Sequence, residues 1–354
     1  MPPIPSIFAT PFMPCRHEVN TRVSCRRQNT HNWLADYVST QITKHRPLSG
    51  GGGTMYVVTG ATGHTGNVVA TNLLKQGATV RVIGRSAKRL EGLTAKEANP
   101  FIADLTDAVA ITEAMKGAQG AYVMMPPNLS TPDLHEFQTR VADAIAAGVK
   151  ASGVTHVVAL SSIGADKAER TGPVIGRHYL EQKLNQIDGL NVLHLRAGYF
   201  MENTLAQVGN IQKTGSALGP LRPDLKVPMI ATKDVGEAAA HALMALDFSD
   251  KQSRELLGHR DISMNEVAQI LGQAIGKPDL QYIQAPDEQV RHALIQLGMS
   301  PNMAELTLEM SAALNSGHMR ALESRSEQNT TLTSYETFVN EEFIPLYRRA
   351  SAAA

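Results

Sequence analysis

Short runs of apolar residues recur along the chain from residue 55 onward, and amphipathic stretches with apolar positions three or four residues apart separate them. Runs rich in β-branched and aromatic residues predict buried strands, and the stretches between them predict helices. We expect strands at residues 56–58, 79–83, 101–103, 121–125, 155–160 and 191–196. Strands that alternate with helices are typical of a parallel sheet with helices on both faces, so the predicted fold class is α/β.

Beyond residue 200 the pattern becomes mostly helical. Ser263 and Glu266 have the spacing of a capping box, which predicts a helix through Ile275. Residues 304–314 and 335–348 also have helical spacing of apolar positions. We therefore expect a core at about residues 55–200, a small, mostly helical C-terminal substrate region at about 201–345, and a frayed tail at 346–354.

Three glycines follow the first strand and open the first helix. One must make a tight turn, one must let the backbone approach a pyrophosphate, and one must let helix pack on strand. The N–H groups at the helix start would then face the anion. The sequence predicts a dinucleotide site here, and the alternative is a glycine-rich turn without a ligand. The candidate binding residues of this turn are Gly60, Thr62, Gly63, His64, Thr65 and Gly66.

The end of the second strand bears on the choice of cofactor. NAD-binding units have an acid about twenty residues after the glycines, where it binds the ribose 2′-hydroxyl. Here Gly84 and Arg85 hold that place, so no carboxylate would repel a 2′-phosphate. Arg85, with Ser86, could bind the phosphate and stack on adenine. We predict NADP(H) as the cofactor. The alternative is NAD(H), with Arg85 a solvated loop residue.

The ends of the next strands should complete the site, because ligands bind beyond the carboxyl ends of parallel strands. Asp104 and Leu105 follow the third strand and are candidates for contacts with adenine, although Asp107 or Thr106 could instead cap the next helix. Further candidates near the nicotinamide are Met125 and Ser161 for the cofactor, and Pro126 and Ile163 for the substrate pocket.

Several segments together resemble the NmrA-like branch of the atypical short-chain dehydrogenases/reductases. The matching segments are residues 58–66, 84–86, 103–105, 160–165, 181–184 with 189–190, 195–203 and 227–236. The similarity covers roughly residues 55–345. It implies a Rossmann-like, doubly wound parallel sheet, NAD(P) binding and a small C-terminal substrate region. Members include NADPH-dependent reductases of quinones and dyes, and cofactor sensors without known turnover. In the family the loop containing Phe200 and Met201 lies by the nicotinamide, so both are candidate pocket residues.

Tyr179 and Lys183 have the spacing of the superfamily's catalytic pair, in which tyrosine donates a proton and lysine lowers its pKa. The helix that carries them is expected over about residues 173–188, starting at the cofactor end of the sheet. At about 1.5 Å per residue, Lys183 would lie about 15 Å along that helix, near its far end. The position therefore argues against catalysis.

Alignment with the family supports the same interpretation. A family glutamate lies four residues after the catalytic lysine, and Glu181 fits that place. The lysine position then falls on Arg177 and the tyrosine position on Pro173. Two hypotheses stay open, a catalytic Tyr179–Lys183 pair or two helix-surface residues. His178 is a further candidate proton donor. Ile163 lies where relatives often have the catalytic serine or threonine.

The first 54 residues differ from the rest. They hold six Lys/Arg against two acids, a net +4 in a chain of net charge zero, and both cysteines, Cys15 and Cys25. This extension could be an organellar presequence, a disordered tail, or sequence upstream of a true start at Met55. The remaining residues have no cysteine, which fits a reducing, cytoplasmic setting. No apolar run reaches the ~18 residues of a membrane span, and neither a nucleic-acid partner nor a metal site is expected.

These observations lead to two functional hypotheses. The first is an NADPH-dependent reductase whose small-molecule substrate is a flat conjugated acceptor, such as a quinone or dye. Such acceptors delocalise charge and need little acid–base help from the protein. The second is a cofactor-binding sensor without turnover. The glycine motif does not separate the two, because both bind the dinucleotide.

Overall fold

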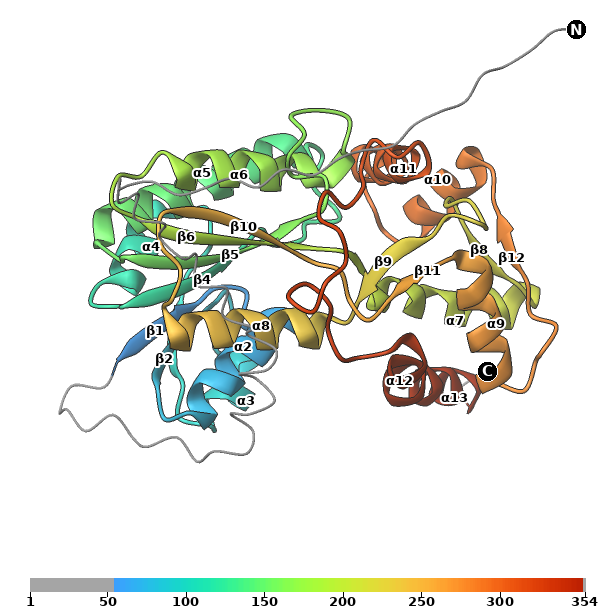
Figure 1. Ribbon diagram of the computed structural model, residues 1–354, viewed down its shortest axis with the longest axis horizontal. Coiled ribbons are helices and arrows are strands. Elements are labelled where there is room, and N and C mark those ends of the chain that lie inside the picture. Colours follow the sequence, from blue (N-terminus) through green and yellow to red (C-terminus); the bar gives the residue numbers. More distant parts are fainter. Residues whose placement is uncertain (1–53, 353–354) are drawn as a thin grey trace, which may run out of the picture.

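The structure of the protein is a computed structural model that describes residues 54–352. The predictions for the N-terminal extension fall outside this range, apart from Thr54. Figure 1 shows two regions side by side: a larger one built on a central sheet, and a smaller one formed mostly by the C-terminal part of the chain.

Within residues 54–352, seven parallel strands form the central sheet, in the order β10-β6-β5-β4-β1-β2-β3. The order reverses at β1, so the carboxyl ends of β1 and β4 flank the switch point at which such sheets bind ligands. All six predicted strands are confirmed to within two residues, while β10 was not predicted. The strands are β1 (Met55–Val58), β2 (Thr79–Gly84), β3 (Asn99–Ile102), β4 (Gly120–Met124), β5 (His156–Ser162), β6 (Asn191–Ala197) and β10 (Lys251–Leu256).

Helices cover both faces of the sheet, which confirms the doubly wound architecture (Figure 1). One face carries α2 (His64–Lys75), α3 (Ala87–Thr94) and α8 (Thr232–Ala245); the other carries α4 (Ala108–Met115), α5 (Leu134–Ser152) and α6 (Ile175–Asn185). Neighbouring strand residues such as Val57 and Val58 pack into opposite cores, and neither is exposed. A strand buried on both faces reads as the continuous apolar run seen in the sequence.

The smaller region combines short strands with helices. Its strands are β7 (Tyr199–Phe200), β8 (Ala217–Gly219), β9 (Val227–Ile230), β11 (Asp261–Ile262) and β12 (Tyr282–Gln284), and its helices are α7 (Gln207–Thr214), α9 (Met264–Ala274), α10 (Asp287–Gln296), α11 (Pro301–Asn315), α12 (Tyr335–Phe338) and α13 (Ile344–Ala352). The chain reaches this region after β6, returns to the sheet as α8 and β10, and then leaves again. The two regions are therefore interleaved.

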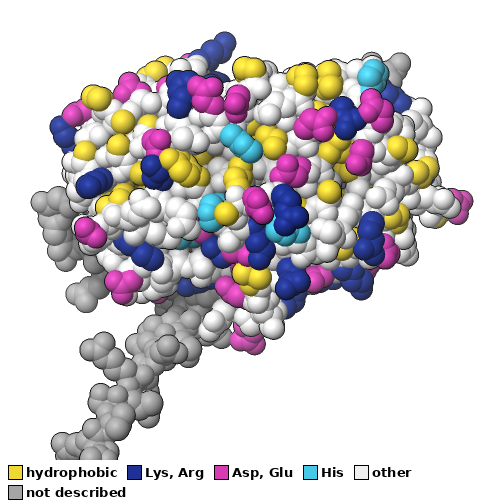
Figure 2. All heavy atoms as spheres, turned by 90° about the horizontal axis from the view of Figure 1, so that it is seen from above, with side chains coloured by type: hydrophobic (Ala, Val, Ile, Leu, Met, Phe, Trp, Pro, Cys, Tyr) yellow, Lys and Arg dark blue, Asp and Glu magenta, His cyan; other side chains and the backbone are white. Residues whose placement is uncertain are grey.

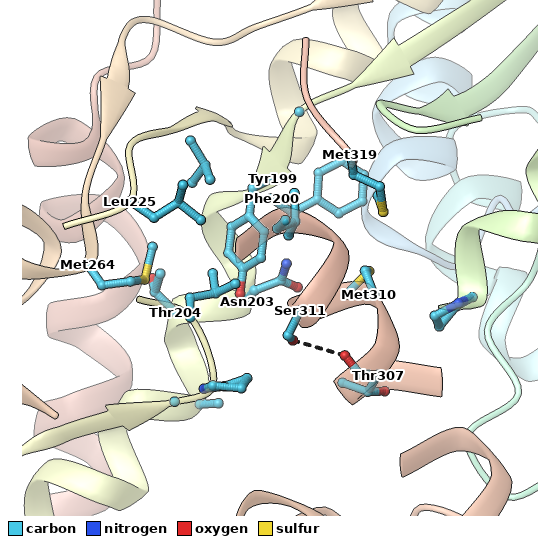
Figure 3. A pocket seen from close by; sticks show the side chains of 18 of the residues that line it. Tyr199, Phe200, Asn203, Thr204, Leu225, Met264, Thr307, Met310, Ser311 and Met319 are labelled. Atoms are coloured by element: carbon cyan, nitrogen blue, oxygen red, sulfur yellow. Dashed lines mark hydrogen bonds between the residues drawn. The ribbon is translucent and has the colours of Figure 1, made fainter. Parts of the chain in front are cut away.

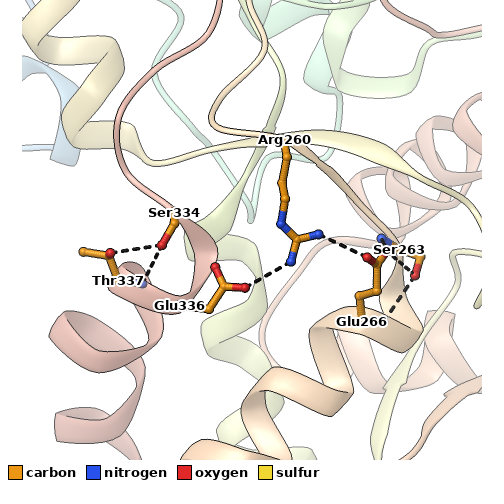
Figure 4. A network of polar contacts seen from close by, with 6 residues as sticks. All are labelled: Arg260, Ser263, Glu266, Ser334, Glu336 and Thr337. Atoms are coloured by element: carbon orange, nitrogen blue, oxygen red, sulfur yellow. Dashed lines mark hydrogen bonds and ion pairs between the residues drawn. The ribbon is translucent and has the colours of Figure 1, made fainter.

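The C-terminal helices are part of the fold. Ser263 and Glu266 form the predicted capping box of α9, and Arg260 extends it by binding Glu266 and Glu336 of α12, each at 3.1 Å (Figure 4). The tail expected at residues 346–354 differs from the structure, because α13 continues through Ala352. Leu346 and Tyr347 of α13 pack against the core of the smaller region, which explains why the helix persists.

The surface has no dominant charge on the face seen in Figure 2, where basic and acidic side chains are intermixed. Among residues 54–352, no helix is both long enough and apolar enough to cross a membrane.

Candidate active site

The glycine turn has the backbone geometry that the motif predicts. Gly60 has φ +61°, a left-handed conformation that favours glycine. A Cβ atom added at Gly66 would lie 2.4 Å from the Gly60 carbonyl oxygen, so only glycine lets α2 approach the strand end this closely. These two positions are required by the turn itself, whether or not a ligand is bound.

The start of α2 leaves room for an anion. Gly63 is the N-cap and is exposed, no side chain caps the helix, and its first turn has no acidic residue. Thr62 and His64 flank this exposed glycine, with Thr62 half-buried and His64 exposed. Uncapped N–H groups at a helix start are suited to a pyrophosphate. Thr65 is buried instead, and its hydroxyl accepts a hydrogen bond from Tyr122 at 2.8 Å.

Polar residues lie at the ends of β2 and β3. Arg85 is exposed and Ser86 is the N-cap of α3. Asp104 accepts hydrogen bonds from the N–H (2.9 Å) and hydroxyl (2.7 Å) of Thr106. Burial acts to raise the pKa of Asp104, but these hydrogen bonds and the charges of Arg85 and Arg140 outweigh it and lower the pKa. Leu105 beside it is buried. The cap of α4 is Asp107, which leaves Asp104 outside the helix.

A cavity of about 880 Å³ lies between the two regions of the molecule. Its walls come from the ends of β5 and β6, the start of α6, the loop after β6, and helices α10 and α11. Figure 3 shows Tyr199 and Phe200 on one side of this pocket and Met310, Ser311 and Thr307 of α11 near them. Five methionines line it: Met264, Met299, Met303, Met310 and Met319. Aromatic rings and flexible thioethers form an apolar surface suited to a flat ligand.

The structure places the four predicted pocket residues in different surroundings. Ile163 and Phe200 line the cavity. Met201 is buried in the core of the smaller region and does not line it, because the chain turns at Met201 into a 3₁₀ helix, Met201–Ala206. Pro126 is half-buried just after β4 and is also outside the lining. Met125, predicted near the nicotinamide, is buried in the core between the sheet and α5.

Ser161 belongs to a buried polar network. Its hydroxyl donates to Oε1 of Glu181 at 2.5 Å. Glu181 in turn forms a bidentate ion pair with Arg196, with Nε–Oε1 at 3.0 Å and Nη2–Oε2 at 2.6 Å. The hydrogen bond from Arg196 to Glu181 raises the pKa of Arg196. A buried carboxylate needs such partners, so this network holds α6 against the ends of β5 and β6.

Tyr179 and Lys183 lie away from the pocket, on the side of α6 that faces α5. Both side chains bind Asp143 of α5, the tyrosine hydroxyl at 3.0 Å and the lysine Nζ at 2.8 Å. The bond to Asp143 also raises the pKa of Lys183. Neither residue lines the cavity, whereas Arg177 and Pro173 both do. The geometry thus favours the helix-surface hypothesis for this pair, in which it joins two helices.

His178 is likewise outside the cavity lining. Its Nδ1 donates a hydrogen bond to the carbonyl oxygen of Ala165 at 2.8 Å, which ties α6 to the loop after β5. This contact gives the side chain a structural role. It does not place an imidazole nitrogen in the pocket, where a proton donor would be needed.

Glu202 lines the candidate site but was not among the residues predicted from the sequence. It lines both the large cavity and a second one of about 400 Å³, which also touches Thr62, Gly63 and His64 of the glycine turn. Its Oε1 accepts hydrogen bonds from the N–H (2.9 Å) and hydroxyl of Thr232, while Oε2 is buried and has no partner among residues 54–352. Glu202 lies inside segment 195–203, which resembles the family, and this resemblance could have identified it as a candidate.

The sequence model of the NmrA-like family matches residues 54–344. One curated relative is named a reductase and another an oxidoreductase. A (4-alkanoyl-5-oxo-2,5-dihydrofuran-3-yl)methyl phosphate reductase from Streptomyces griseus is 25% identical over 265 residues, 74% of this chain and 88% of that protein. Quinone oxidoreductase 2 from Escherichia coli is 24% identical over 267 residues, 74% of this chain and 89% of that protein.

Solved structures support the fold. The NADPH-dependent quinone oxidoreductase from Escherichia coli, complexed with NADPH, has a TM-score of 0.70 and 22% identity, covering 82% of this chain and 100% of that one. Triphenylmethane reductase from Citrobacter sp., complexed with NADP(H), has a TM-score of 0.69 and 17% identity, covering 81% and 99%. At these identities the similarity shows a shared fold.

Proposed function

The chain belongs to the NmrA-like family, and we propose that it is an NADPH-dependent reductase of flat, conjugated acceptors such as quinones or dyes. The observation that supports this most directly is the cavity of about 880 Å³, which adjoins the carboxyl ends of β5 and β6 and is lined by Phe200, Tyr199 and five methionines. The names of the two curated relatives describe a reductase and a quinone oxidoreductase, and the named ligand of both solved structures is NADPH or NADP(H), which agrees with the proposal.

The residues at the switch point fit the cofactor. The uncapped start of α2 would hold the pyrophosphate, Arg85 and Ser86 the 2′-phosphate, and Asp104 with Leu105 the adenine. When bound, NADPH supplies a hydride. The chain's own contribution is to orient the acceptor against the walls of the pocket and to exclude water from it. Ser161 and Met125, both buried, stay predicted neighbours of the nicotinamide end.

The missing tyrosine acid agrees with this substrate class. Within residues 54–352, Tyr179 and Lys183 are bound to Asp143 outside the cavity. An isolated ketone would need a proton donor as charge develops on its oxygen. A quinone spreads the charge over a conjugated ring, so solvent can deliver the proton later.

The same observation favours one alternative, a cofactor-binding sensor without turnover. The test is oxidation of NADPH by the purified full chain, followed at 340 nm with a panel of quinones and triphenylmethane dyes. We expect acceptor-dependent oxidation. Saturable NADPH binding without any acceptor-dependent oxidation would reject the reductase and support the sensor. The cytoplasmic location also stays a prediction, which imaging of a C-terminal fluorescent fusion would check.

A further inference from the structure

Arg177 is a cation of the pocket that lacks a carboxylate partner in the described part of the chain. It lies in the first turn of α6, is half-buried, and lines the large cavity. Its one hydrogen bond among residues 54–352 runs from Nη1 to the carbonyl oxygen of Pro173, at 3.0 Å. A guanidinium has five N–H donors, so most of them are left for a ligand.

An unpaired charge that is partly buried is costly, and the protein avoids this cost elsewhere. Arg196 of β6 is paired in bidentate fashion with Glu181 of α6. Arg177 receives no such partner, and burial lowers its pKa. Because arginine stays protonated in proteins even so, the pocket contains a partly desolvated positive charge. Such a charge is stabilised by an anionic or electronegative ligand.

The guanidinium is also held in place before any ligand binds. The Pro173 carbonyl that fixes Nη1 accepts a second hydrogen bond, from Nε2 of the buried Gln138 at 2.8 Å. Ser161 near the end of β5 and Ile163 just after it line the same cavity, at the end of the sheet where parallel strands place their ligands. Donors that are fixed in advance are the kind that stabilise charge developing in a transition state.

We propose that Arg177 is a catalytic residue that donates hydrogen bonds to the acceptor oxygen on which negative charge develops during reduction. This rests on the proposed reductase function. A quinone acceptor gains a hydride from the reduced nicotinamide, whose C–H bond breaks as the new bond to the acceptor forms. The acceptor is reduced by two electrons to a hydroquinone monoanion, and the cofactor is oxidised to NADP⁺. Arg177 holds the anionic oxygen until a proton from solvent neutralises it.

The experiment compares Arg177→Met and Arg177→Lys with the unmodified full chain. With menadione as the neutral acceptor, Arg177→Met should lower kcat/KM by about 100-fold, as expected for loss of one oxyanion donor. The dissociation constant of NADPH should change by less than about threefold. Arg177→Lys keeps a charge but loses the bidentate geometry, so it should regain part of the activity. Thermal denaturation checks that both variants fold.

A binding measurement without NADPH separates charge recognition from turnover. In titration calorimetry at neutral pH, 2-hydroxy-1,4-naphthoquinone is an anion that carries its charge on ring oxygens, whereas menadione is neutral. Arg177→Met should weaken binding of the anion at least about tenfold and leave menadione within about threefold. Lys183→Met is the matched control, because it removes a cation from the same helix outside the cavity; it should change neither affinity.

Each contrary result has a distinct meaning. If Arg177→Met weakens NADPH at least about tenfold and leaves the anionic quinone unchanged, the residue holds the cofactor and the proposal is wrong. If the unmodified chain reduces quinones and Arg177→Met retains that activity, only the role of Arg177 is rejected. If the unmodified chain reduces no acceptor, the reductase function and this catalytic role are both rejected.

Discussion

The glycine turn at residues 60–66 and the Tyr179–Lys183 pair are both short patterns found in dehydrogenases, but the fold uses them differently. The glycines lie at the end of β1, where backbone must pass within contact distance of backbone. The pair lies at the middle and end of α6, where both side chains bind Asp143. The first pattern has the surroundings that its chemistry needs, and the second has surroundings that suit a helix contact.

The difference lies in what each pattern specifies. A glycine motif specifies backbone approach, so one misplaced residue would prevent the turn from forming. A Tyr-x-x-x-Lys spacing specifies only that two side chains share a helical face. Which way that face points depends on the residue at which the helix starts, and here the start of α6 at Ile175 places Arg177 at the cavity and the pair outside it. Spacing alone is therefore weaker than spacing tied to a strand end.

The largest effect is expected from Gly66→Ala in the glycine turn. The added Cβ would lie 2.4 Å from the carbonyl oxygen of Gly60, a backbone atom that cannot move aside. We expect a loss of about 3 kcal/mol in unfolding free energy and no measurable NADPH binding. Gly92→Ala in α3 is the matched control, because a Cβ there meets nothing within 4 Å. Equal stability of the two variants in urea would contradict this account of the turn.

The anchoring of α6 can be tested by pH through His194. This buried ring donates from Nε2 to Oδ1 of Asn185 at the end of α6, while Nδ1 has no partner in the described part of the chain. Burial lowers the pKa of His194 from 6.5 to about 4. Because the unfolded state binds the proton first, the stabilisation is complete above pH 6.5 and falls as the pH drops toward 4.

We expect the contribution of His194 to the free energy of unfolding to fall by about 2 kcal/mol between pH 7 and pH 5. Urea denaturation of the unmodified chain and of His194→Gln at both pH values measures this change, with the glutamine variant losing less stability on acidification. A pH dependence that is the same in both proteins would show that His194 does not carry it.

The substitution Arg85→Asp tests the part of the predicted nucleotide site that would bind the 2′-phosphate. The side chain is exposed, so the variant should keep its melting temperature. A carboxylate at this place would repel a 2′-phosphate, and NADPH should bind at least about tenfold more weakly, a loss of about 1.4 kcal/mol. NADH should be affected less. Lys75→Asp, the same charge change at the far end of α2, is the control. Tighter binding of NADH than NADPH by the unmodified chain would refute the predicted preference.

The smallest effect is expected at the Tyr179–Lys183 pair. Tyr179→Phe removes an exposed hydrogen bond to Asp143. It leaves the lining of the cavity unchanged, because Tyr179 is not one of the lining residues. Exposed contacts of this kind contribute about 0.5 kcal/mol, so kcat/KM should stay within about twofold and stability should barely change. A fall of about 100-fold in kcat with an intact fold would instead restore the tyrosine as a catalytic acid.

Much of the larger region could be predicted from sequence, because most of its strands, such as β1, β4, β5 and β6, are buried apolar runs that lie between helices. The glycine turn and the capping box of Ser263 were also predictable, since both are local. The parallel pairing of β8 with β12 was not, because three-residue strands more than sixty residues apart leave no local pattern. Strand β10 was missed because its first three residues, Lys251, Gln252 and Ser253, are exposed at the edge of the sheet.

The site shows the same limit. The buried contact of Ser161 with Glu181 and Arg196 joins residues from a strand end, a helix and another strand. Such a network depends on tertiary packing, which spacing does not encode. Phe200 and Met201 are neighbours in sequence, yet one lines the cavity and the other is buried in the core. The start of a 3₁₀ helix between them decides this, and the apolar pattern did not predict it.

The interleaving of the two regions bears on how such a protein can evolve. Strand β10 of the central sheet follows β7 and β9 of the smaller region in the sequence. Neither region is therefore one contiguous segment that could be exchanged as a module. Recombination at a single point would remove an edge strand from one region or a wall from the other. New specificity would therefore have to arise by point substitution. Helices α10 and α11 are the accessible targets, because they contribute lining residues to the cavity and lie outside the three sheets that residues 54–352 form.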